Sequence, residues 1–558
     1  MAVARFDASV MTLIQGYDAR GQSRVIPVLT LTGASLDVHT EDADDPLTPG
    51  GCPGLPPCVT IRVVSALDLL VSRLPDGAVR TDAETLRERA IDSWTLALLR
   101  RVRGDELPAP AAVVFPASTE EVATVLAWAS ETATAVIPRG GGSGVCGGVE
   151  ADAGSVVLDL ARMNKIGQVD AVSQTVNVQA GVRGDQLEDA LAGHGLTTGH
   201  YPQSIAMSTV GGWIAASSAG QASTGFGAIE DVLLGLTAVL PQGEILRCQP
   251  VPRSAAGPDL RRLLVGSEGT LAVITEATLA CRARPAAWEW LAFGFATFSE
   301  LAKALREAVR AETGAAVLRG YDETDAQLGF GALGHPGGCV GMAGFPAGLP
   351  GLDARKQAVA EAMRKNGASG ELGARYGEHW WEHRNDAVRT YAQIMGPERA
   401  FGSGMIVDTM EVAGLWSTVP RLYQDIREAL AGHAQAVGCH LSHLYPSGSS
   451  LYFTFLISGA DDQEAEARYR AAWEAAARSC AATGGTITHH HGVGRLKARF
   501  LVDDLGETGV SVLTRIKAAL DPAAIMNPQV MNPQVMNPQV MNPQVMNPQV
   551  ITGRRDAP

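Results

Sequence analysis

The chain has 558 residues, of which 46% are hydrophobic and 19% are charged, a composition typical of an ordered protein with large apolar cores. Its length favours two or three domains over one. The formal net charge of -14 disfavours general binding to nucleic acid or to an anionic membrane surface, because both need clustered Lys and Arg.

The eight cysteines are scattered, and no pair has the spacing of zinc ligands. Only Cys52 and Cys58 lie close together, so free thiols are favoured over a disulfide framework. We see no signal peptide, no peroxisomal address and no apolar run near the ~20 residues that span a bilayer. These features predict a cytoplasmic protein.

The first 110 residues divide into two predicted parts. Residues 1–60 are an N-terminal extension of uncertain structure, and their stretch 41–57 is acidic and then rich in Pro and Gly, as in a linker. Residues 61–110 are predicted to be helical. One helix over 82–102 is indicated by apolar residues at spacings of three and four: Ile91, Trp94, Leu98 and Val102.

Strands alternate with helices from about residue 112. A strand over Ala133–Ile137 leads into the glycine-rich segment Pro138–Gly144, and further strands are predicted at Val156–Leu160 and Thr175–Val178. After about residue 284 the pattern of predicted helices and strands changes and indicates a second α+β domain. Its long helices are predicted at Phe298–Glu312, Leu352–Asn366 and Asp462–Thr483, with strand-like runs such as Ser450–Ile457 between them.

The C-terminal region contains a perfect short repeat. The pentapeptide Met526-Asn-Pro-Gln-Val530 occurs five times without change and ends at Val550. Five residues are too few for a solenoid unit, and a proline in each copy excludes a helix. We predict a low-complexity tail over 526–558 with no catalytic role.

The glycine-rich segment satisfies the pattern G-x-G-x-x-G at Gly142–Gly147. A Rossmann site requires the third glycine to open a helix, but here the chain continues into the strand at Val156. A Rossmann NAD site is therefore not predicted. Residues 140–148 still contain six glycines, so successive backbone N–H groups can converge on a phosphate. The alternative is a surface turn.

Two other segments are also poor in side chains. Ser208–Trp213 precedes a run of small residues at Ala215–Gly220, and Gly266–Thr270 precedes another strand. Each segment alone could be a tight turn. Three such loops together indicate backbones that pack closely around an extended, flat ligand, which predicts a cofactor of dinucleotide size.

These motifs resemble the FAD-binding flavoprotein family of vanillyl-alcohol-oxidase type, and within it the alkylglycerone-phosphate synthase group, from about Val71 to Ile525. The resemblance implies an α+β fold: a two-subdomain FAD-binding domain over 111–285, an α+β cap domain with an antiparallel sheet over 286–485, and a segment over 486–525 that returns to the flavin. The segments that carry it are Gly199–Ser204, Ser208–Trp213, Gly257–Asp259, Gly266–Leu271, Val273–Thr278 and Thr488–Gly494.

The resemblance also implies which residues bind FAD. Some family members tether the flavin through a histidine near the glycine loop, but here that position reads Gly-Gly-Gly-Ser, so we expect non-covalent FAD. The implied cofactor-binding residues are Pro138, Arg139, Gly140, Gly141, Gly142, Ser143, Gly144, Gln203, Ser204, Ser208, Thr209, Gly212, Ala215, Ser217, Ser218, Glu268, Gly269, Thr270 and Ile274.

Three consecutive histidines, His489, His490 and His491, are the first candidates for the reacting groups. On a regular strand neighbouring side chains point to opposite faces, so all three could not bind one metal, and we predict no metal site. They could simply be exposed to solvent. The flanking glycines bend the chain, however, and the resemblance implies that the triplet lines the flavin's substrate face, where neutral imidazoles bind phosphate or transfer protons.

Tyr452 lies on a predicted strand, on the face opposite Leu451, Phe453 and Phe455. The pattern alone favours an ordinary solvated tyrosine, whereas the resemblance implies the proton-abstracting residue of the synthase group. Arg319 matches an arginine expected near the flavin or the substrate phosphate; the alternative is a surface arginine.

For this group the resemblance implies an exchange without net redox. Tyr452 as phenolate removes a proton from C1 of acyl-dihydroxyacetone phosphate, flavin N5 traps the substrate, the fatty acid leaves and a long-chain alcohol adds. A phenolate near neutral pH requires nearby positive charge, from the histidines or Arg319. We also expect a lipid substrate, peripheral membrane contact and a homodimer.

Two other functions stay open. A FAD-dependent dehydrogenase or oxidase of a 2-hydroxy acid or another alcohol is the main alternative, but its relatives carry a His…Asp-Gly-Asn-x-His stretch and a Glu-His-Gly motif. This chain has Ser442–Gly448 and His490-His491-Gly492 instead, without the acidic ligands. The other alternative is flavin binding without catalysis. Ala215–Ser218 also lacks an arginine expected in the animal synthase, which suggests a different substrate head group.

Overall fold

The computed structural model describes residues 10–17, 23–30, 34–39 and 60–531. The N-terminal strands form two antiparallel pairs. The predicted linker at 41–57, together with Cys52 and Cys58, lies outside the described residues. The paired strands are β1 (Val10–Tyr17) with β2 (Ser23–Thr30), and β3 (Ala34–His39) with β4 (Thr60–Ser65).

The prediction of one helix over 82–102 is wrong, because the chain forms α2 (Ala83–Arg89) and α3 (Thr95–Arg103) with an extended stretch between them. In that stretch Ile91 makes a β-bridge to Glu150 beside the glycine loop. Ile91 and Trp94 of the extended stretch still pack in the same core that Leu98 of α3 contacts, so the apolar spacing reflects a shared core rather than one helical face. The neighbouring elements are α1 (Ala66–Arg73) and the short strand β5 (Val79–Arg80).

The first part of the FAD-binding region is a four-stranded sheet of order β5-β6-β8-β7. Its strands β6 and β7 both run parallel to β8, and α4 (Thr119–Thr132) precedes β7. The strand predicted from Ala133 begins later, because Ala133 ends α4 in the left-handed conformation with φ 52°. No helix separates β7 from β8, as expected for a site that is not of Rossmann type. The strand bounds are β6 (Ala112–Val114), β7 (Val136–Arg139) and β8 (Val156–Asp159).

The second part is an antiparallel sheet of order β13-β12-β14-β10-β9. Its core is formed by strand residues and by Trp213 and Ile214 of α6, which follows the loop at Ser208. The strands are β9 (Ile166–Asp170), β10 (Thr175–Gln179), β12 (Leu233–Val239), β13 (Ile245–Cys248) and β14 (Val273–Ala280). The helices are α5 (Gly184–Ala192), α6 (Val210–Ala215), α7 (Ser223–Phe226), α8 (Ile229–Val232) and α9 (Leu260–Leu264).

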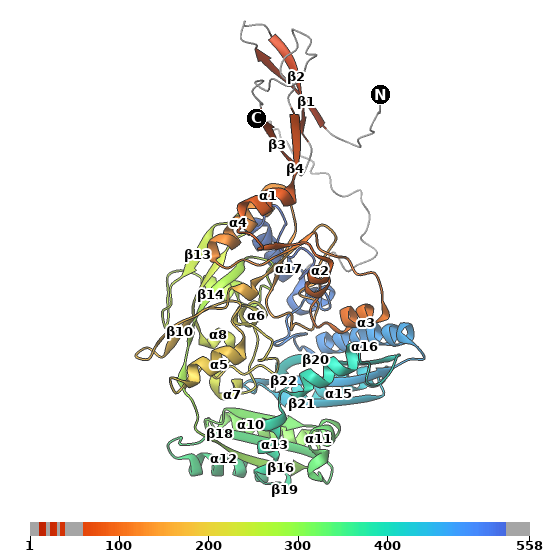
Figure 1. The fold of residues 1–558 in the computed structure, drawn as a ribbon. Helices are drawn as coiled ribbons and strands as arrows, with labels where there is room; N and C mark the ends of the chain where they lie inside the picture. The colour runs from red at the N-terminus through yellow and green to blue at the C-terminus, as the bar shows by residue number, and fades with distance from the viewer. Residues whose placement is uncertain (1–9, 18–22, 31–33, 40–59, 532–558) are drawn as a thin grey trace, which may run out of the picture.

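The cap is built on a seven-stranded antiparallel sheet of order β19-β16-β18-β17-β21-β22-β20, seen in the lower half of Figure 1. Along β22 the side chains of Leu451, Phe453 and Phe455 are buried and Tyr452 is on the other face, as predicted. The strands are β16 (Trp288–Phe295), β17 (Val317–Tyr321), β18 (Cys339–Pro346), β19 (Ala368–Glu371), β20 (Met405–Leu415), β21 (Ala436–Ser442) and β22 (Gly448–Ser458).

Long amphipathic helices cover the buried face of this sheet. Their apolar residues, such as Leu305, Leu422 and Trp473, share one core with Phe453 and Phe455. The covering helices are α10 (Phe298–Arg310), α12 (Leu352–Lys365), α15 (Val419–Ala431) and α16 (Asp462–Thr483), and the others are α11 (Glu323–Phe330), α13 (Arg375–His383) and α14 (Asp386–Met395).

The C-terminal part returns from the cap to the first sheet, and Figure 1 shows α17 (Leu501–Leu520), in blue, beside the orange and yellow elements of the FAD-binding region. Met526 bridges Val136 of β7. The first copy of the pentapeptide, at the start of the predicted low-complexity tail, is packed into the fold: Met526, Asn527 and Val530 are buried. Local pattern could not distinguish this copy from the following identical ones.

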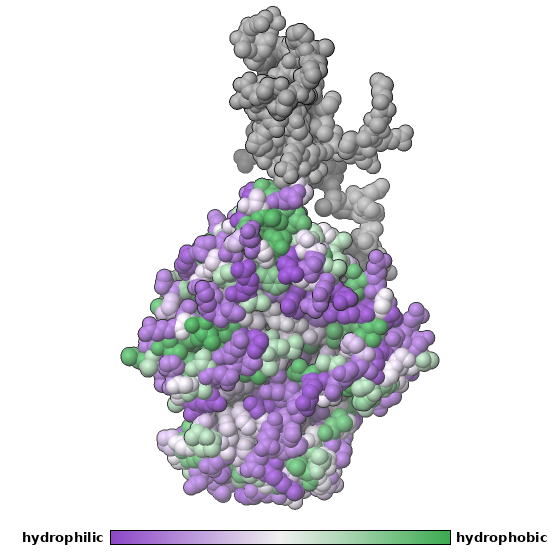
Figure 2. All heavy atoms as spheres, in the orientation of Figure 1, coloured by the Kyte–Doolittle hydropathy of each residue, from purple (hydrophilic) through white to green (hydrophobic). Residues whose placement is uncertain are grey.

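None of the helices in the described part of the chain is long and apolar enough to cross a membrane. Among the coloured residues of Figure 2, hydrophilic side chains predominate on the face in view, and hydrophobic ones form small scattered groups. The cysteines within the described ranges are free, as expected.

Candidate active site

One row of polar side chains crosses the cap sheet on the face opposite Leu451, Phe453 and Phe455. The register places Glu411 of β20 opposite Tyr452 of β22, Tyr452 opposite His440 of β21, and His440 opposite Tyr321 of β17. The rings of His440 and Tyr452 stack with centroids 4.6 Å apart. The antiparallel pairing thus gathers, from four strands, groups that are far apart in sequence.

The three consecutive histidines lie in a loop that is held by Glu411. Its Oε1 accepts hydrogen bonds from the backbone N–H groups of His489, His490 and His491, at 3.1, 3.1 and 2.7 Å. The hydroxyl of Thr488 donates a further bond to the same oxygen at 2.8 Å. This local geometry bends the chain around one carboxylate, so the three rings do not alternate as they would on a strand.

Glu411 is itself paired with a buried lysine. Nζ of Lys497 lies 2.5 Å from Oε2 of Glu411, and both side chains are almost completely buried. Burial alone would raise the pKa of the Glu411 carboxyl, but the charge of Lys497 and the hydrogen bonds lower it to about 2. The anchor of the loop is therefore an ionised carboxylate at neutral pH.

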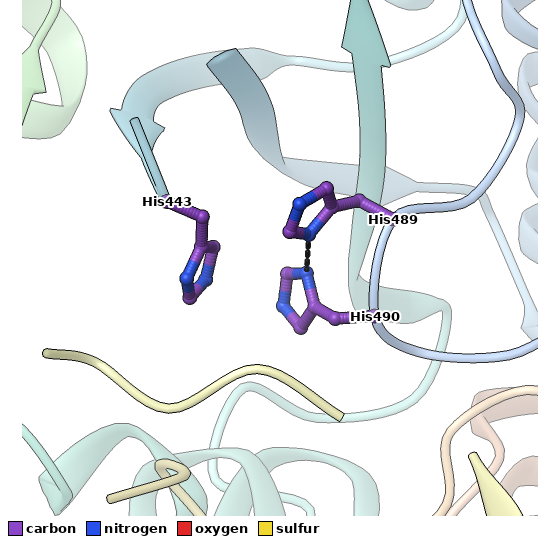
Figure 3. A group of neighbouring side chains, drawn as sticks. All are labelled: His443, His489 and His490. Atoms are coloured by element: carbon purple, nitrogen blue, oxygen red, sulfur yellow. Dashed lines mark hydrogen bonds between the residues drawn. The ribbon is translucent and has the colours of Figure 1, made fainter. Parts of the chain in front are cut away.

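His489 and His490 meet His443, which follows β21, as Figure 3 shows. Nδ1 of His489 lies 3.0 Å from Nδ1 of His490, and Nδ1 of His443 bonds to Oγ of Ser223 at 2.6 Å. Burial lowers the pKa of each of these imidazoles, so the rings are neutral. One nitrogen from each ring lies within 4.8 Å of the others. The sequence predicted no metal site, but three imidazole nitrogens at this spacing are a donor set that suits a divalent transition metal.

Tyr452 donates a hydrogen bond to Oγ1 of Thr409 at 3.1 Å. Burial, with the charges of Glu411 and Asp408, raises the pKa of its phenol above the ordinary value. This differs from the expected phenolate stabilised by positive charge from the histidines or Arg319, because the neighbouring imidazoles are neutral and the charges acting on the phenol are those of acidic groups. A phenolate here requires positive charge brought by the ligands or a proton acceptor close by.

Arg319 is buried at 7% exposure on β17, not on the surface. Its Nε donates to the hydroxyl of Tyr321 at 2.8 Å, and its guanidinium lies over the Trp380 ring at 5.0 Å. A cation fixed in this way, two residues from the polar row, is suited to a substrate anion.

The glycine loop after β7 presents free backbone donors. The N–H groups of residues 140–147 make no hydrogen bond to any other residue in the described ranges. A Cβ on Gly140 would lie 2.5 Å from Oγ1 of Thr209, and one on Gly141 would overlap the carbonyl of Met207. The loop thus needs glycine to approach the 207–212 segment, and its unpaired N–H donors suit a diphosphate such as that of FAD.

Several of the predicted FAD-binding side chains instead hold the protein together. Oε2 of Glu268 accepts from the backbone N–H of Val493 at 3.0 Å, and Nε2 of Gln203 donates to the carbonyl of Arg384 at 3.2 Å. Ser208 donates to the carbonyl of Ser204. These residues can contact FAD through the backbone, while their side chains order the loops that surround it.

Sequence reasoning missed four residues that organise the site: Glu411, Lys497, His443 and Asp92. Asp92 accepts from the N–H of Val149 at 3.2 Å and lies against the glycine loop, where burial raises the pKa of its carboxyl to about 7. Two acidic residues, Asp408 and Glu411, inside the mostly apolar run Met405–Leu415 were the available signal for Glu411. Its position opposite Tyr452 required the strand register.

Residues 110–249 match the family described as FAD binding domain, and residues 284–531 match the family described as FAD linked oxidases, C-terminal domain. Alkyldihydroxyacetonephosphate synthase of Dictyostelium discoideum is 31% identical over 467 residues, which cover 77% of this chain and 75% of that protein. The chain belongs to the FAD-linked oxidase family of vanillyl-alcohol-oxidase type. FAD is its cofactor.

Other members of the family have different names. An uncharacterized FAD-linked oxidoreductase of Escherichia coli O157:H7 is 30% identical over 489 residues, covering 84% of this chain and 98% of that protein. Glycolate oxidase subunit GlcD of Bacillus subtilis is 28% identical over 429 residues, covering 75% and 88%. A solved structure of alkyldihydroxyacetonephosphate synthase superposes with a TM-score of 0.70 at 25% identity, covering 93% of this chain and 96% of that one. The expected α+β flavoprotein fold is thus confirmed.

Proposed function

We propose that this FAD-linked enzyme exchanges the acyl chain of an acyl-dihydroxyacetone phosphate for a fatty alcohol, without net redox. The observation that carries the proposal is the row Glu411–Tyr452–His440 beside three neutral histidines and no ligating carboxylate within the described part of the site. A neutral phenol among imidazoles serves proton transfer to and from a carbon acid. The 31% identity to the Dictyostelium synthase supports the same substrate class.

In this proposal each group of the chain has one task. Tyr452 faces the substrate carbon and exchanges its proton, Arg319 binds the phosphate, and the histidines accept protons from the reacting groups. When bound, FAD would supply an electron-poor ring beside these groups. The free N–H groups of residues 140–147 would hold its diphosphate.

The proposal is tested by incubating the purified holoprotein with acyl-dihydroxyacetone phosphate and labelled hexadecanol. We expect the label in an ether product, with the flavin still oxidised in its absorption spectrum. Tyr452→Phe is expected to lower the rate by about a hundredfold or more, because it removes the transferring hydroxyl. Bleaching of the flavin without incorporation would overturn the proposal.

A second function is favoured by one observation. The nitrogens of His443, His489 and His490 lie within 4.8 Å of one another, and a metal held there would serve oxidation of a 2-hydroxy acid. Glycolate oxidase subunit GlcD is also among the relatives. Flavin reduction by a hydroxy acid, lost on chelation and restored by Zn²⁺ or Mn²⁺, would establish this function in place of the first.

A further inference from the structure

Tyr445 lies at the solvent side of the histidine cluster. It is 40% exposed and occupies the turn between β21 and β22. Its backbone is fixed on both sides: its N–H donates to the carbonyl of Gly448 at 2.9 Å, and its carbonyl accepts from Nε1 of Trp416 at 2.9 Å. A side chain on such a fixed turn holds its direction without support from a ligand.

The hydroxyl of Tyr445 begins a continuous chain of hydrogen bonds that leads inward. It lies 2.9 Å from Nε2 of His489, and Nδ1 of His489 lies 3.0 Å from Nδ1 of His490. Both nitrogens of the His489 ring are therefore engaged, one toward solvent and one toward the interior. The inner end, Nε2 of His490, makes no hydrogen bond to any residue that the structure describes.

The groups of this chain have the donors and acceptors that a relay needs. Each imidazole has two ring nitrogens, so it can accept a proton on one nitrogen while it releases one from the other. A phenol hydroxyl both donates and accepts, so the Tyr445 hydroxyl can take a proton from His489 and give its own proton to water.

We propose that Tyr445, His489 and His490 form a proton relay between the flavin face and bulk solvent. This inference rests on the proposed function for its direction. The C1–O bond to the acyl group breaks, the C1–O bond to the alkyl group forms, the fatty acid leaves as a carboxylate and the alcohol enters neutral. One proton must therefore leave the buried site in each turnover.

The relay accounts for that proton. Nε2 of His490 takes it up, and Nδ1 of His490 passes a proton to Nδ1 of His489. His489 releases a proton from Nε2 to the Tyr445 oxygen, and the Tyr445 hydroxyl gives its own proton to water. Tyr452 has no such route, because its hydroxyl bonds to Thr409 and to no other group in the described ranges.

The first test measures turnover of three variants of the holoprotein. Tyr445→Phe and Tyr445→Ala are expected to lower turnover by about ten- to a hundredfold, since both break the outer link. Imidazole in the buffer restores Tyr445→Ala, whose missing ring admits it beside His489. Tyr423→Phe is the matched control, because it also removes a tyrosine hydroxyl with one hydrogen bond, to Asp322 at 3.1 Å, away from the histidines.

The second test needs no turnover. In protein labelled with ¹⁵N at histidine, Tyr445→Phe is expected to shift the ring nitrogens of His489 and also of His490, which Tyr445 does not touch. Tyr423→Phe shifts neither. A mere packing role for Tyr445 would change His489 alone.

The outcomes separate the relay from the proposed function. An active protein whose Tyr445 variants match the parent in rate overturns the relay and leaves the function standing. A parent without any alkyl transfer overturns the function, and the nitrogen shifts then decide the relay. Unchanged His490 nitrogens in Tyr445→Phe overturn the relay in either case.

Discussion

Two buried carboxylates hold the same short loop, one from each side. Glu411 of the cap binds the N–H groups of His489, His490 and His491, whereas Glu268 of the FAD-binding region binds those of Val493 and Gly494. The loop that carries the histidines is thus clamped between the two parts of the molecule.

The two carboxylates differ in charge although their backbone partners are alike. Burial raises the pKa of Glu268 to about 7, because the hydrogen bonds only partly offset the loss of water. Burial has the same tendency at Glu411, but the contact with Lys497 overrides it and lowers the pKa to about 2. Backbone donors alone do not keep a buried carboxylate ionised, whereas one adjacent ammonium group does.

Removing the ionised anchor is expected to have the largest effect. Glu411→Gln leaves Lys497 buried without a counter-charge, so unfolding in urea should show a loss of about 3–5 kcal/mol. Alkyl transfer should fall with it, because the neutral amide oxygen of Gln is a weaker acceptor for the N–H groups of the histidine loop than the carboxylate. The double variant Glu411→Gln/Lys497→Met should recover most of the stability and not the activity. Equal stability of the single variant and the parent would show that the buried Lys497 does not need the Glu411 carboxylate as its counter-charge.

Glu268 should make stability depend on pH in the opposite sense to an ordinary carboxylate. Its pKa is raised in the folded state, so its contribution is fully present below the unfolded value near pH 4 and is lost as the pH rises through about 7. We expect the parent to lose about 3 kcal/mol over this interval from Glu268. Glu268→Gln should flatten the profile in urea titrations from pH 4 to 8, and an unchanged slope would refute the assignment.

A smaller effect is expected at the point where the C-terminal segment meets Glu268. Nδ2 of Asn527 donates to the carbonyls of Gly148 and Glu268, both at 2.9 Å. Asn527→Ala leaves these acceptors unpaired and should lower the free energy of unfolding by about 1–3 kcal/mol. The same substitution in the last copy, Asn547→Ala, is the matched control and should leave the free energy of unfolding unchanged.

The smallest effect is expected from metal removal. If Glu411 and Glu268 hold the loop so that neutral imidazoles transfer protons, dialysis against a chelator should leave alkyl transfer unchanged. Added Zn²⁺ should inhibit, because it competes for the nitrogens of His443, His489 and His490. Loss of activity on chelation would show that the histidines act as metal ligands.

The sequence was sufficient where a local pattern carries the structure. The alternation around Tyr452, the glycine loop without a following helix and the long helix Asp462–Thr483 were all predictable from spacing and residue type. The sequence was insufficient where pairing between distant strands decides the neighbours. Glu411 lies opposite Tyr452 through the register of β20 with β22, and it meets the histidine loop where Ala413 of β20 bridges Thr486. The extended stretch at Ile91 pairs with Glu150, which is distant in the sequence.

The first Met-Asn-Pro-Gln-Val unit adds a backbone bridge and two side-chain hydrogen bonds to the FAD-binding region. The four units that follow are identical to it. Deletion of any single unit in the coding sequence would therefore restore the same five residues directly after Ile525. Loss of repeat units therefore leaves the sequence at this junction unchanged as long as one unit remains after Ile525.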